Sequence, residues 1–302
     1  MKKRVFVLGA GCSYDRFKVL TNNLFQVLWK RGLREDKELR SLLRYLYPPR
    51  YDGRVHPEEV NIEDLLSCID AAIHLEGINS KGIYSSDMLR AVRARLIKAL
   101  VALFWRKGSS LDKSYVAFAK QLDPSDVIIT FNYDIELERA IAERTGAAIH
   151  QLYFPSPRQY PWKKWPDVLK LHGSINLAEE KGKMAWMDVP TDVEKPIILA
   201  PTIFKDPKFV STHWWNSARS SLSQAKEVWF VGYSLAPLDF AARYIIRRGI
   251  RMMLKKRPSA PIHVVDPSPE ILRRYISQIH SVIDYKRAVF SEFVEKILPG
   301  TA

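Results

Sequence analysis

Four short apolar segments constrain the fold more than any other feature of this 302-residue chain. They lie at residues 5–8, 126–130, 227–231 and 261–265, with weaker candidates at 168–171 and 197–199. Continuous runs of this kind, rich in β-branched and aromatic residues, are typical of strands buried on both faces of a parallel sheet. Helical patterns follow at residues 134–143, 238–254 and 269–279. This alternation predicts an α/β fold with a doubly wound, Rossmann-like parallel sheet.

The stretch from residue 35 to residue 109 interrupts the alternation. It contains helical patterns at residues 37–46, 62–75 and 87–105 and no convincing strand. We interpret residues 35–109 as a helical insertion, and residues 1–34 together with 110–302 as one Rossmann-like domain.

Charge and cysteine content limit the classes of protein. Lys and Arg number 47 against 33 Asp and Glu, so the formal net charge is +14. Such a surface attracts nucleic acid, a phosphorylated small molecule or an acidic partner. The densest basic run, residues 247–257, fits either a solvated helix face or a contact with nucleic acid.

Two cysteines, Cys12 and Cys68, are too few for a disulfide framework or a four-cysteine zinc site. No apolar run reaches the roughly 18 residues of a membrane span, and the run after the basic N-terminus is too short for a signal peptide. We expect a cytoplasmic protein without a metal site.

Polar and glycine residues follow the predicted strands. Because ligands of doubly wound sheets bind at the carboxyl ends of the strands, these residues are the candidate site. Glycines let a backbone approach a diphosphate, a histidine serves as a base near neutral pH, and a strand-end acid accepts hydrogen bonds from ribose. In chain order the candidates are Gly9, Ala10, Gly11, Ser13, Asn132, Asp134, His172, Gly232, Ser234 and Asp266.

Several candidates also have a plain structural interpretation. Asp134 and Asp266 can cap helices, Asn132 can be a turn residue, and a lone histidine is often structural. The glycine loop lacks the third glycine of the dinucleotide fingerprint, because Tyr14 occupies that position.

Four motifs together resemble the sirtuin family. They are the GAG-x-S loop at residues 9–13, T-x-N-x-D at 130–134, the histidine segment LHGS at 171–174 and GYSL at 232–235, in the family's order. The resemblance implies that the Rossmann-like domain binds NAD, with Asn132 and His172 as catalytic residues. It implies that the other candidates bind the dinucleotide and gives Cys12 no role.

The sequence departs from sirtuin deacylases at the zinc module. Residues 174–195 contain no cysteine, whereas the deacylases carry two C-x-x-C pairs there. The helical insertion, residues 61–66 and residues 198–202 resemble the SIR2-like branch of prokaryotic defence systems. That resemblance implies hydrolysis of NAD⁺ to nicotinamide and ADP-ribose, without zinc, by an enzyme that is latent until triggered.

Two other functions stay open. One is an NAD-dependent protein deacylase without the zinc module, and the other is a non-enzymatic NAD, ADP-ribose or nucleic-acid-binding module. A toxic hydrolase would be restrained, so we also expect a homo-oligomer through the 35–109 helices or an activating partner protein.

Overall fold

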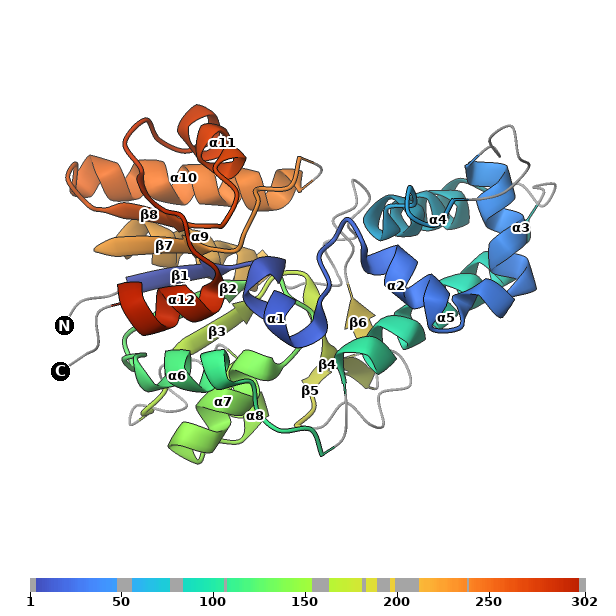
Figure 1. Ribbon diagram of the computed structural model, residues 1–302, viewed down its shortest axis with the longest axis horizontal. Coiled ribbons are helices and arrows are strands. Elements are labelled where there is room, and N and C mark those ends of the chain that lie inside the picture. The colour runs from blue at the N-terminus through green and yellow to red at the C-terminus, as the bar shows by residue number, and fades with distance from the viewer. Residues whose placement is uncertain are drawn as a thin grey trace.

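In the computed structural model of the protein, the described residues are 4–47, 56–76, 84–105, 108–153, 163–180, 183–188, 196–198, 212–237 and 239–298. Its core is a six-stranded sheet in the order β3-β2-β1-β7-β8-β9, with every neighbouring pair parallel (Figure 1). The strands are β1 (Arg4–Leu8), β2 (Val127–Thr130), β3 (Asp167–Lys170), β7 (Glu227–Val231), β8 (Ile262–Val265) and β9 (Asp284–Lys286).

This topology confirms the predicted doubly wound fold. From β1 the chain moves outward through β2 and β3 on one side, then returns to β7 and moves outward through β8 and β9 on the other. The order therefore reverses between β1 and β7, and in such sheets the crevice at that reversal binds the ligand.

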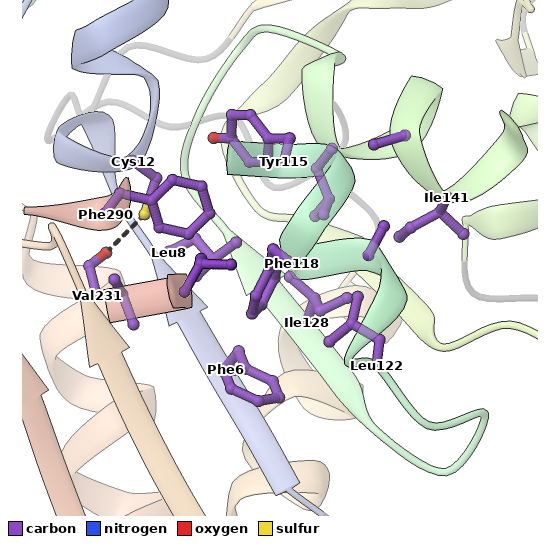
Figure 2. Close-up of a cluster of buried hydrophobic side chains, with 14 of the residues drawn as sticks. Phe6, Leu8, Cys12, Tyr115, Phe118, Leu122, Ile128, Ile141, Val231 and Phe290 are labelled. Atoms are coloured by element: carbon purple, nitrogen blue, oxygen red, sulfur yellow. Dashed lines mark hydrogen bonds between the residues drawn. The ribbon is translucent and has the colours of Figure 1, made fainter. Parts of the chain in front are cut away.

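Helices cover both faces of the sheet, because successive strand residues point to opposite faces. Phe6 and Leu8 belong to an aromatic cluster with helices on one face (Figure 2), whereas Val5 and Val7 pack on the other. The first face is covered by α6 (Lys113–Lys120), α7 (Glu136–Thr145), α8 (Ile149–Leu152) and α12 (Phe290–Glu292) with the π-helical turn Phe293–Ile297. The second is covered by α9 (Thr212–Gln224), α10 (Phe240–Lys256) and α11 (Glu270–Gln278).

In the described residues between β1 and β2, every regular element is a helix. Four of these helices stand to one side of the sheet (Figure 1). These are α2 (Leu24–Lys30), α3 (Lys37–Leu46), α4 (Ile62–Glu76) and α5 (Ser86–Phe104). They share one core, which also takes in Ile175 and Ile198 from outside the 35–109 stretch. The division into domains at residues 34 and 110 stays a prediction. No helix in the described ranges is long and apolar enough to cross a membrane.

A second, antiparallel sheet was not predicted. It has the order β5-β4-β6, formed by β5 (Lys183–Trp186), β4 (Gly173–Glu180) and β6 (Pro196–Ile198). Ser174 and Asn176 alternate with Ile175 and Leu177, which is a strand signal in the sequence, but all four residues are buried. The weak candidate at residues 197–199 belongs to this sheet, although Leu199 lies outside the described residues.

Asp36 joins helices α3 and α5. Its carboxylate caps α3 by accepting from Leu39 N at 3.0 Å and pairs with Arg95 of α5 at 2.6 Å. Burial raises the pKa of Asp36, but the hydrogen bonds from Arg95 and Leu39 outweigh it and lower the pKa overall.

A carboxyl group whose pKa is lower in the folded state than in the unfolded state stabilises the fold at pH values above its unfolded-state pKa. This stabilisation is lost as the pH falls through the folded-state pKa. We therefore expect the free energy of unfolding to fall from about pH 5 downwards, and less steeply in Asp36→Asn. Because Asn caps helices as well as Asp does, this variant removes the charge and keeps the cap, whereas Asp36→Ala costs about 1 kcal/mol more. Urea unfolding across this pH range measures both effects. Identical pH dependence in wild type and Asp36→Asn would contradict the assignment.

Candidate functional site

The loops after β1 and β7 pack directly on each other at the reversal point. Gly9 N donates to Val231 O and Gly11 N to Gly232 O, both at 3.1 Å. A Cβ on Gly9 would lie 2.4 Å from Gly232 O, and one on Gly11 would lie 2.7 Å from Gly232 Cα. Gly232 itself has a φ of +57°. These glycines therefore permit the contact between the loops, and the amides of Gly9 and Gly11 are already used within the protein.

Cys12 lies inside the glycine loop and points into the core. Its thiol is 3% exposed and donates to Val231 O at 3.1 Å (Figure 2). Burial raises the pKa of the thiol far above its usual range. Because the thiolate is the reactive form of cysteine, Cys12 is not a nucleophile in this structure.

Ser13, Asn132 and Asp134 form one hydrogen-bonded network. Ser13 Oγ donates to Asp134 Oδ2 at 2.7 Å and lies 2.8 Å from Tyr115 Oη. The hydroxyl hydrogen of Ser13 is thus used on the carboxylate, and Tyr115 donates to Ser13. Asn132 Nδ2 donates to Gly9 O at 3.0 Å and to Ser13 Oγ at 3.2 Å. With both amide hydrogens used, Asn132 presents Oδ1 as an acceptor.

A buried ion pair anchors the loop that carries this network. Lys170, at the end of β3, donates to Asp134 O and pairs with Glu138 Oε1 of α7 at 3.0 Å. Both charged side chains are 1% exposed. Asp134 Oδ1 also accepts from Glu136 N, the first residue of α7, at 3.1 Å. The N-cap of α7 is Ile135, so Asp134 lies one residue before the cap.

His172 lies in the turn between β3 and β4, in a second cluster. Its Nε2 is 2.9 Å from Asp239 Oδ2, and the two side chains are 6% and 1% exposed. Asp239 also accepts from Ala242 N at 3.3 Å as the N-cap of α10, so the carboxylate is fixed. The imidazole packs edge-on against Phe131 at 4.9 Å, and Phe131 stacks on Tyr233 at 4.5 Å. Phe131 precedes Asn132, which connects the two clusters.

Gly173, which follows His172, does not make room for a ligand. Gly173 has a φ of +77°, and a Cβ there would lie 2.2 Å from Ile197 O. The backbone of β6 fills the space, so this glycine serves the pairing of β4 with β6.

The remaining candidates lie at the ends of β7, β8 and β1. Ser234 is exposed, and its carbonyl accepts from Arg274 at 2.5 Å. Asp266 is half-buried and accepts from Ser268 N at 2.9 Å; burial raises the pKa of its carboxyl, and the Ser268 bond opposes the shift. Ala10 begins the short 3₁₀ helix Ala10–Ser13 and is half-buried.

Sequence reasoning missed three side chains of these clusters. Tyr115 and Lys170 carry no local signal, because their partners are distant in the chain. Asp239 does carry one, since it precedes an apolar helical pattern as a typical N-cap. In the described part of the chain, no three His, Cys, Asp or Glu side chains are grouped to hold a metal ion.

Comparison with known proteins identifies the family. The sequence model of the SIR2-like domain matches residues 126–283, which include the T-x-N-x-D, LHGS and GYSL motifs. The chain belongs to the SIR2-like family. No curated protein matches its sequence significantly.

Solved structures show the fold of this SIR2-like protein. A Sir2 homologue in complex with NAD superposes with a TM-score of 0.53 at 14% identity, over 98% of this chain and 88% of that chain. A mutant Sir2 homologue with 2′-O-acetyl ADP-ribose gives 0.52 at 14% identity, over 98% and 90%. These likenesses establish a sirtuin-like Rossmann fold.

Proposed function

We propose that this SIR2-like protein hydrolyses NAD⁺ to nicotinamide and ADP-ribose and is latent until triggered, as in the defence NADases of its family. The observation that carries the proposal is that two clusters adjoin at Phe131. One is the hydrogen-bonded network around Asn132, and the other is His172 with Asp239. Asn132 is held with its acceptor oxygen oriented, and the adjoining Phe131 packs against a histidine that Asp239 holds in place.

The dinucleotide would lie across the loops at the reversal point, without zinc. Gly9, Gly11 and Gly232 would bring the loops together, and Ala10, Ser13 and Ser234 would flank the diphosphate. Asp266, at the end of β8, would accept hydrogen bonds from the adenosine ribose. Asp134 would hold Ser13 and the nicotinamide side of the loop through its bond to Ser13 Oγ.

Hydrolysis breaks the bond between ribose C1′ and the nicotinamide nitrogen, whose electron pair leaves with the neutral nicotinamide. Water then bonds to C1′ and loses a proton. Asn132 Oδ1 would orient this water or a ribose hydroxyl, and His172 would take the proton. With Nε2–H directed at Asp239, the basic lone pair of His172 is on Nδ1.

Burial of three residues of the candidate site supports latency. Ser13 is 5% exposed, Asp134 4% and His172 4%. NAD⁺ would reach them only after neighbouring groups move, which a partner protein or oligomerisation through the 35–109 helices would drive.

Nicotinamide release from NAD⁺ by the purified protein tests the proposal. We expect nicotinamide and ADP-ribose in equal amounts, at a rate that rises more than linearly with protein concentration if self-association is the trigger. NAD⁺ consumption that requires an acetyl-lysine peptide would replace the proposal with the deacylase. NAD⁺ binding by calorimetry without turnover, both at high protein concentration and with an activating partner protein present, would replace it with the sensor.

A further inference from the structure

Helix α10 presents a basic face that also carries aromatic rings. Its 17 residues include six Lys or Arg and no Asp or Glu. Apolar residues such as Ile246, Ile250 and Met253 are buried in the sheet core, which fixes the orientation of the helix. The exposed residues that define the α10 face are Phe240, Tyr244, Arg247, Arg248, Arg251 and Lys255.

These six residues form one stripe. At about 100° per residue they fall within a sector of about 100°, and they extend over about 22 Å of helix. Figure 1 shows α10 along the sheet and well apart from helices α2 to α5.

The described residues provide no ion-pair partner for the charges of this face. Within the described ranges, no basic side chain of α10 forms an ion pair. Arg247 donates to Gln278 O at 2.9 Å and Arg248 to Tyr244 Oη at 2.8 Å, which are neutral partners. The positive potential of the stripe is therefore open to an external anion.

The two aromatic rings are exposed to an unusual degree for their size. Phe240 and Tyr244 are each 59% exposed and lie one helical turn apart. Arginines flank both rings, with the Arg243 guanidinium 5.8 Å from the centre of the Phe240 ring and Arg248 bonded to Tyr244. The fold gains little from rings left in water, whereas a stacking ligand would cover them.

We propose that the α10 face binds single-stranded nucleic acid. Arg247, Arg251 and Lys255 would contact phosphates, and unpaired bases would stack on Phe240 and Tyr244. Cations beside stacking rings are the combination that single-strand binders use. A duplex hides its base faces and an anionic lipid surface has none, so neither ligand would use both features.

Fluorescence anisotropy with a labelled oligo(dT) of about 20 nucleotides tests this proposal. We expect an affinity that falls steeply between about 50 and 200 mM salt. Tyr244→Ala should weaken binding about 5- to 150-fold, the loss of one stacked base. Arg248→Glu/Arg251→Glu should weaken it at least as much.

The matched control is Arg90→Glu/Lys98→Glu, which makes the same charge change at two exposed positions of α5. We expect this control to retain most of the affinity. Equal weakening by both double variants would overturn the proposal, because binding would then follow net charge alone. Unchanged binding by Tyr244→Ala, or a preference for duplex DNA or phosphatidylserine vesicles over oligo(dT), would also overturn it.

Discussion

Replacing His172 with Ala should lower the rate of nicotinamide release from saturating NAD⁺ about 10²- to 10⁴-fold, the usual loss when a general base is removed. In the proposed reaction this side chain takes the proton of the attacking water, so the effect should lie in kcat. NAD⁺ binding, measured by calorimetry, should change little, because the dinucleotide contacts come from other loops. Asn132→Ala should cause a loss of similar size, since Oδ1 orients the same water.

Asp239 offers a graded control for this experiment. Asp239→Asn keeps an N-cap for α10, because Asn caps as well as Asp, but removes the charge beside His172 Nε2. As a positioning residue Asp239 should matter less than His172, and its variant should change the pH profile of kcat while NAD⁺ binding stays intact. Hydrolysis by His172→Ala at half the wild-type rate or more would remove the histidine from the mechanism.

Much of the fold follows from local sequence, because the central strands are buried on both faces. Such strands are continuous apolar runs, and the run at residues 227–231 coincides with β7. The candidates Ser13, Asn132 and Asp134 follow from the same reasoning, since their positions directly after strands place them at one edge of the sheet. The structure does bring these three together.

Other features depend on contacts that no local pattern contains. Helix α9 has the sequence THWWNSARSSLSQ, which is poor in strong helix formers, and it is helical because Ala218 and Leu222 pack under α10 and the sheet. Gly173 resembles a glycine that makes room for a ligand until β6 is seen to fill the space. Lys170 and Glu138 would be assigned to the surface by their charge, and their burial becomes understandable only because they pair.

That pair supports the second large prediction. Lys170→Met should lower the free energy of unfolding by about 3–5 kcal/mol, because it leaves the Glu138 carboxylate buried without its cation. Burial already raises the pKa of Glu138, and the Lys170 ammonium opposes that shift. Urea unfolding at neutral pH measures the loss.

The double variant Lys170→Met/Glu138→Leu separates charge compensation from positioning. Replacing both members of a buried pair by apolar side chains is often neutral or stabilising, so most of the stability should return. The hydrogen bond from Lys170 to Asp134 O stays missing, and the loop with Asn132 loses its anchor. Nicotinamide release should therefore stay low in the refolded double variant. A double variant as unstable as Lys170→Met would show that the uncompensated Glu138 charge does not cause the loss of stability. Full activity together with restored stability would show that Lys170 does not position the loop.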